Sequence, residues 1–141
     1  MRALGLDLGS KRIGVAISDS AGTLATPIEV VKRVGDRPRE HRAIADLVDE
    51  WEAEIVVVGL PLNMDGSAGP MAKKYRSEAK ALGDTLRVPV VQYDERLTTV
   101  TAERSLMEQS MKADARRDVV DKVAAAVMLQ AWLDAGMPDG R

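Results

Sequence analysis

The chain has 141 residues, of which 45% are hydrophobic and 30% are charged, and its formal net charge is −2. This length supports one hydrophobic core, so we expect a single domain over residues 1–141. The absence of cysteine excludes disulfides and thiolate metal sites, and it fits a reducing, cytoplasmic location. We find no signal peptide and no apolar run long enough to span a membrane, so we expect no membrane partner.

The charged residues are unevenly distributed along the chain. Cations gather at residues 11–12, 32–39, 73–76 and 116–117, whereas acids concentrate between residues 46 and 54. Net charge alone does not favour a nucleic-acid partner, because binding to phosphate is largely electrostatic. The clusters permit one basic face, and a mixed solvated surface is the alternative.

The N-terminal part predicts three strands joined by short links, at residues 2–8, 12–18 and 23–32. Apolar residues alternate with small ones in the second strand, which follows a tight turn at Ser10-Lys11. Pro27 suits the third strand to the edge of a sheet. The short links favour an antiparallel meander.

The rest of the chain predicts alternating helices and strands. Helical spacing indicates helices at residues 39–52, 70–86, 97–109 and 117–135, and apolar runs indicate strands at 55–58 and 88–93. The continuous apolar run at 55–58 is typical of a central parallel strand. The order βββαβαβαα therefore predicts an α/β protein with a mixed five-stranded sheet flanked by helices. Sites in such sheets lie beyond the carboxyl ends of the parallel strands.

Asp7 stands within the first predicted strand. It shares one side of that strand with Ala3, Gly5 and Gly9, while leucines occupy the other side. These small residues leave room for a ligand beside Asp7. A buried carboxylate must be paired or must bind a metal, and for Asp7 alone a structural role is the better explanation.

Two further pairs of acids could join Asp7. Asp94 and Glu95 end the fifth predicted strand, and because neighbours on a strand face opposite sides, only one of them can face Asp7. Asp118 and Asp121 share a face at the start of the last predicted helix, before a run of alanines that would allow close approach to the sheet. The helix dipole offers an alternative explanation for acids at a helix start.

Carboxylates that converge from two strand ends and a helix suit hard cations. Mg²⁺ and Mn²⁺ prefer oxygen ligands, and a pair of such ions can activate water and stabilise the leaving oxygen of a phosphodiester. The single histidine, His41, falls in helical register with Ile44, Val48 and Trp51, which predicts a histidine at the edge of the core. We therefore expect no zinc site.

Four segments together resemble the YqgF/RuvX family of RNase H-like nucleases, which is related to the RuvC Holliday-junction resolvases. The segments are GLDLGSKRIGVA at 5–16, GLPLNMDGS at 59–67, DERLTT at 94–99 and VVDKVAAAVMLQ at 119–130. They extend in order from the first predicted strand to the last predicted helix.

The resemblance implies an RNase H-like fold and a catalytic site in which Asp7, Glu95 and Asp121 bind Mg²⁺ or Mn²⁺. It selects Glu95 over Asp94 and Asp121 over Asp118. We interpret Asp118 as an acid at a helix start, and a fourth acid of the site is the alternative. It also implies a nuclease that processes the 5′ end of pre-16S rRNA, a structured RNA. Resolution of Holliday junctions in branched DNA is the alternative, and that reaction would need a homodimer rather than a monomer.

Several polar residues lie beside these acids and are candidate contacts to nucleic-acid phosphates. Backbone donors in the loop that contains Asn63 also suit a phosphate, because this loop precedes a predicted helix N-terminus. Surface solubility is the alternative role of the cations, and Arg96 could instead pair with a site acid. Aromatic residues make up only 3% of the chain, so recognition through backbone and shape is favoured over base stacking. The candidate contacts are Lys11, Arg12, Asn63, Arg96, Arg116 and Arg117.

Two other classes of function compete with a nuclease. The Asp-Leu-Gly-Ser segment at residues 7–10 also resembles the phosphate loop of the sugar-kinase, Hsp70 and actin group. Those proteins pair two such domains around ATP, and this chain is long enough for one. The third class is a non-catalytic RNA-binding ribosome-assembly factor that keeps the acids for folding.

Overall fold

The computed structural model describes residues 1–61, 68–94 and 113–138, and within 113–138 it describes side chains from residue 119 onward. Five strands form one sheet in the order β3-β2-β1-β4-β5. β2 runs antiparallel to both of its neighbours, β1 and β3, whereas β1, β4 and β5 run parallel to one another. The strands are β1 (Ala3–Leu8), β2 (Arg12–Ser18), β3 (Ala25–Lys32), β4 (Ile55–Leu60) and β5 (Val90–Asp94). The helices are α1 (Arg37–Glu50), α2 (Pro70–Thr85) and α4 (Ala113–Asp134).

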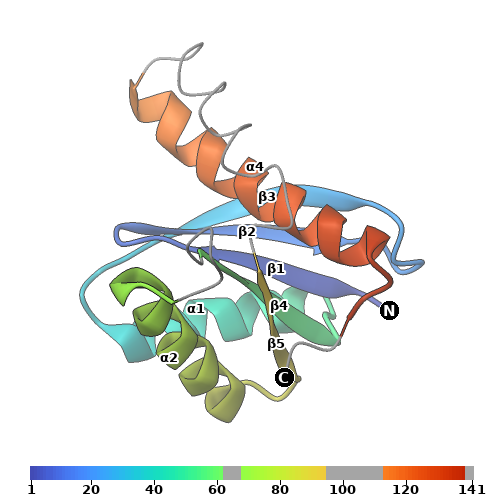
Figure 1. Cartoon of the computed structure of the whole chain (residues 1–141), viewed down its shortest axis with the longest axis horizontal. Helices are drawn as coiled ribbons and strands as arrows, with labels where there is room; N and C mark the ends of the chain where they lie inside the picture. Colours follow the sequence, from blue (N-terminus) through green and yellow to red (C-terminus); the bar gives the residue numbers. More distant parts are fainter. Residues whose placement is uncertain (62–67, 95–112, 139–141) are drawn as a thin grey trace.

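The described helices cover both faces of the sheet. α1 and α2 lie against one face, and among the described helices α4 is the one that crosses the other face (Figure 1). β1 shows how alternation along a strand serves both faces. Its leucines pack under α1 and α2, and Ala3 packs with the residues of α4. None of the described helices is long and apolar enough to cross a membrane.

α4 approaches the sheet closely because glycines lie beneath it. A Cβ atom on Gly5 would stand 2.9 Å from Cβ of Leu129, and one on Gly14 would overlap the carbonyl oxygen of Asp121. The expectation that the small residues beside Asp7 leave room for a ligand is therefore wrong at Gly5, where the side chain of Leu129 and the carbonyl oxygen of Ala125 in α4 occupy the space.

Most of the predicted elements are confirmed. β3 is an edge strand that contains Pro27, and the register shifts between Val15 and Ala16 where this strand pairs with β2. α1 begins at Arg37, because Asp36 accepts a hydrogen bond from the Arg39 backbone N–H at 3.2 Å and Pro38 fits the first turn. The predicted helix at 97–109 lies outside the described residues.

The start of the last helix differs from the prediction. α4 begins at Ala113 rather than at residue 117, because the alanines and arginines that precede residue 118 are good helix formers. Asp121 consequently lies well inside the helix. The helix dipole does not explain its position, since that effect fades within the first turn. The placement of Asp118 at the helix start is corrected for the same reason.

We predict that Gly14→Ala destabilises the protein by about 1–3 kcal/mol, because the added methyl group must push α4 away from β2. Urea unfolding followed by circular dichroism measures this change. Gly83→Ala is the matched control, because its Cβ would lie 3.8 Å from Cβ of Val90, an ordinary contact. It should be neutral or stabilise the helix by up to about 1 kcal/mol. Equal stabilities of the two variants would contradict the close approach of α4.

Candidate active site

Asp7 lies near the carboxyl end of β1 on the face that α4 covers, and only 6% of it is exposed. Its partner on β2 is Gly14. Gly14 is also the residue on which the backbone of Asp121 rests. The sheet and α4 thus bring two acids from opposite ends of the sequence to neighbouring positions.

An ion pair fixes the side chain of Asp121. Nε of Arg12 donates a hydrogen bond to its Oδ2 at 2.7 Å. Arg12 stands two residues from Gly14 on the same strand, so both lie on the face of the sheet toward α4. The two side chains are 23% and 21% exposed, which leaves the pair accessible to solvent. The guanidinium predicted to bind phosphate is therefore bonded to one of the predicted metal ligands.

Asp94 lies on the opposite face of the sheet from Asp7. It pairs in register with Leu60, which belongs to the core beneath α1 and α2. Asp94 and Asp7 thus face opposite sides of the sheet. The choice of Glu95 as the third ligand stays a prediction, because Glu95 lies outside the described residues.

The other candidate residues are placed only in part. Lys11 is exposed in the turn between β1 and β2. Arg116 and Arg117 belong to α4, but their side chains are outside the described part, and Asn63 and Arg96 are outside it altogether. In the described part, no three His, Cys, Asp or Glu residues gather into a metal-binding group. The described residues thus contribute Asp7 and Asp121 to the site.

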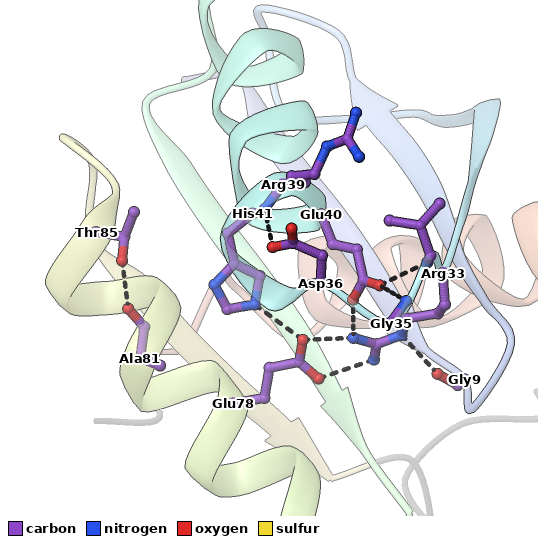
Figure 2. Close-up of polar contacts among 11 residues, drawn as sticks. Gly9, Arg33, Gly35, Asp36, Arg39, Glu40, His41, Glu78, Ala81 and Thr85 are labelled. Carbon is purple, nitrogen blue, oxygen red and sulfur yellow. Dashed lines mark hydrogen bonds and ion pairs between the residues drawn. The ribbon is translucent and has the colours of Figure 1, made fainter.

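A buried ionic network holds the turn that follows Asp7 from the other face of the sheet (Figure 2). Arg33 donates from Nη1 and Nη2 to both carboxylate oxygens of Glu78, at 2.6 and 2.8 Å. Its Nη1 also reaches Glu40 at 3.0 Å, and its Nε donates to the carbonyl oxygen of Gly9 at 3.0 Å. The Arg33 backbone N–H bonds to the carbonyl of Lys11 at 2.9 Å. One side chain therefore joins α1 and α2 to the β1–β2 turn.

The same contacts set the ionisation of the two buried carboxylates. Burial alone would raise the pKa of Glu78, but hydrogen bonds from Arg33 and His41 outweigh it and hold the pKa below its ordinary value. Burial alone would also raise the pKa of Glu40, but hydrogen bonds from Arg33 and from the backbone N–H of Val34 outweigh it and lower the pKa. Both groups are therefore charged at neutral pH.

His41 is confirmed as a histidine at the edge of the core. It is 4% exposed, and its Nε2 lies 2.9 Å from Oε2 of Glu78. Sequence reasoning missed Arg33, Glu40 and Glu78 as supports of the site. One signal in the sequence could have revealed this network. Glu78 is a charged residue at a helical spacing from the apolar Tyr75 and Leu82, which indicates a buried carboxylate that needs a partner.

The strand order and the helix placement define an RNase H-like α/β fold. Thermus thermophilus RuvC in complex with a Holliday junction substrate matches it with a TM-score of 0.64 and 18% sequence identity, covering 100% of this chain and 99% of that chain. A second structure, of Thermus thermophilus RuvC, matches with a TM-score of 0.62, 15% identity and full coverage of both chains. The family model of RuvX, described as Holliday junction resolvase, matches residues 1–135. The chain therefore belongs to the RuvX family, as its four sequence segments indicated.

Relatives of similar length share nearly half of the sequence. One from Myxococcus xanthus strain DK1622 is 49% identical over 138 residues, which cover 98% of this chain and 91% of the relative. One from Caldanaerobacter subterraneus subsp. tengcongensis is 47% identical over 136 residues, which cover 96% and 97% of the two chains. Both carry the name "Putative pre-16S rRNA nuclease".

The network makes stability sensitive to acid. The folded-state pKa values of Glu40 and Glu78 lie below their ordinary value of 4.5, so the unfolded chain binds protons first as the pH falls. We expect their contribution to be complete above pH 4.5 and to disappear as the pH falls through the folded-state values. Urea midpoints measured from pH 3 to 7 test this. The urea midpoint of Glu78→Gln should fall less steeply than that of the wild type as the pH is lowered toward 3. The same pH dependence in both proteins would contradict the role given to Glu78.

We predict that Arg33→Met costs about 3–5 kcal/mol of unfolding free energy, because it leaves two buried carboxylates without their cation. Arg87→Met is the matched control. Arg87 pairs with Asp49 at 2.8 Å, but the two side chains are 60% and 66% exposed. Loss of such a surface pair should cost about 0–1 kcal/mol. Chemical denaturation compares the variants, and similar losses would show that the Arg33 network is not a buried anchor.

Proposed function

We propose that the protein is a divalent-metal-dependent nuclease that hydrolyses phosphodiester bonds during processing of the 5′ end of pre-16S rRNA. The observation that carries this proposal is the seating of Asp121 on Gly14, the strand partner of the buried Asp7. Two acids from distant segments thus occupy neighbouring backbone positions in a chain of the RuvX family. The names of the two relatives supply the RNA substrate. The absence of cysteine agrees with action in the cytoplasm.

The residues at this site suit Mg²⁺ or Mn²⁺. Asp7 and Asp121 offer carboxylate oxygens, which are the ligands that hard cations prefer, and the cationic Arg12 already binds Asp121. Glu95 would be the third ligand; the position of Asp94 on the other face supports this choice. Asp7, Asp121 and Glu95 would hold such ions, whose chemistry would be activation of the attacking water and stabilisation of the leaving oxygen.

Arg12 can bind both an acid and the substrate. Its Nε donates to Asp121, and within the described residues its terminal NH₂ groups make no hydrogen bond. Those groups are available to a phosphate while the Nε bond keeps the side chain in place. Lys11, exposed in the same turn, is a second phosphate contact in this proposal. Asn63, Arg96, Arg116 and Arg117 complete the proposed contacts.

A second candidate function follows from the family description. RuvX is described as a Holliday junction resolvase, so branched DNA is the alternative substrate. A resolvase must cut two strands symmetrically and would act as a dimer. A non-catalytic RNA-binding assembly factor is the third candidate, and it predicts binding without turnover.

We predict that Asp7→Asn and Asp121→Asn each lower metal-dependent cleavage of a pre-16S rRNA 5′ fragment by at least about 100-fold, because each removes a proposed ligand. Glu95→Gln should behave alike. Asp94→Asn is the matched control and should cleave normally, because Asp94 lies on the other face of the sheet. Cleavage of a four-way DNA junction is measured beside the RNA, and circular dichroism verifies folding.

The results separate the three functions. Preferred cleavage of the junction by a dimer would replace the RNA proposal with the resolvase. RNA binding without divalent-dependent turnover would favour the assembly factor. Full activity of a folded Asp7→Asn variant would contradict the proposed site.

A further inference from the structure

A groove separates α2 from the edge strand β5 on the face of the sheet opposite Asp7. Its volume is about 740 Å³, and none of its lining residues belongs to the candidate active site. α2 supplies Lys73, Arg76 and Lys80 to its lining, and β5 supplies Val90 and Gln92. The groove is therefore a surface feature that the proposed catalytic chemistry does not use.

The α2 side of this groove carries three cations and one acid, Asp84, so its net charge is positive. Lys73, Arg76 and Lys80 follow one another at spacings of three and four residues, which place them on one helix face. All three are exposed, and within the described part of the chain none of them makes a side-chain hydrogen bond or an ion pair. These three cations are available to an external anion.

The floor of the groove is apolar and open. Pro89 and Val90 form one part of it, and Gly83 of α2 forms another. A Cβ on Gly83 would find only Cβ of Val90, at 3.8 Å, so a larger side chain there would fill the groove without a clash with the backbone. A cationic rim above an apolar floor suits a strand whose phosphates face outward and whose sugars or bases face inward.

The groove also has a defined relation to the candidate site. β5 runs parallel to β1 and β4, so its carboxyl end, Asp94, lies at the same edge of the sheet as Asp7. Gln92 lies near that end, and Pro89 precedes the opposite end of β5. A strand that occupies the groove would consequently extend away from the catalytic edge.

We propose that this groove binds the sugar–phosphate backbone of the RNA substrate at nucleotides that flank the cleavage site. The inference rests on the proposed nuclease function and extends it by a second contact surface. A second copy of the chain is disfavoured as the occupant, because pairing through this face would oppose Lys73, Arg76 and Lys80 of both copies.

The first test removes the charge. The triple variant Lys73→Gln, Arg76→Gln, Lys80→Gln is compared with a control that loses the same charge elsewhere, Lys32→Gln, Arg37→Gln, Arg42→Gln. All six side chains are exposed. Binding of a labelled pre-16S rRNA 5′ fragment is followed by fluorescence anisotropy without divalent ions, which prevents cleavage. Each lost phosphate contact should flatten the slope of log K against log salt by about 0.7, or by about 2 for three contacts.

The expected affinity loss of the groove variant is up to about 100-fold at 0.1 M salt, which corresponds to that change of slope. The control should lose far less. Gly83→Leu should also weaken RNA binding, although it leaves the charge unchanged, because its side chain fills the groove. In cleavage assays, the groove variants should raise KM more than they lower kcat, since they do not touch the reacting atoms.

A second test uses the absence of cysteine. Ser77 lies among the groove residues, and Ser20 is exposed far from them. Each Ser→Cys variant carries a single thiol, which can be labelled with a photo-crosslinker. We expect the label at position 77 to crosslink to the RNA fragment at nucleotides beside the cleavage site, and the label at position 20 to give none.

The outcomes distinguish the two proposals. If the wild-type protein cleaves the RNA but the groove variants bind like the control and position 77 gives no crosslink, the groove proposal alone is overturned. If the wild-type protein binds through the groove without turnover, only the nuclease function fails, and no binding at all overturns both. A change in the sedimentation of the free groove variant, with RNA affinity unchanged, would assign this face to a second copy instead.

Discussion

The close contact between α4 and β2 is the constraint on which the candidate site depends. Gly14 has no side chain, so the backbone of Asp121 can rest on the strand beside Asp7. Any side chain at this position would insert a spacer and separate the two acids. Alanine-rich packing along the rest of α4 maintains the same close approach, as Ala124 and Ala125 show by their burial. The absence of a side chain on Gly14 therefore determines the geometry of the site as much as the acids do.

The β1–β2 turn is held from both faces of the sheet. On one face, Arg12 binds Asp121 of α4. On the other, Arg33 binds the carbonyl of Gly9 and joins it to Glu78 of α2 and Glu40 of α1. The desolvation of buried charges is costly, so such a network adds little net stability compared with apolar packing. Its main effect is to hold the groups that it joins in one orientation. In this protein it fixes the segment that follows Asp7.

The sequence was sufficient to predict the architecture because local patterns agreed with one another. Period-two alternation, the apolar run of β4 and the resemblance all pointed to the mixed sheet that the strand order confirms. Long-range pairings were not predictable. Nothing in the sequence indicated that Arg12 would bind Asp121, or that Arg33 would reach Glu78 across separate elements. The last helix was predicted to start at residue 117, and the error arose because the helix propensity of the alanines and arginines at residues 113–117 was given too little weight.

The order of the site residues along the chain has a consequence for synthesis. Asp7 lies in the first strand, whereas Asp121 lies in the last described helix. A ribosome produces the N-terminal part first, so a growing chain presents Asp7 long before α4 has emerged to cover it. Until that helix docks on Gly14, the two acids have no common location. The pair of acids therefore comes together only after α4, the last described helix, has been synthesised and has docked on the sheet.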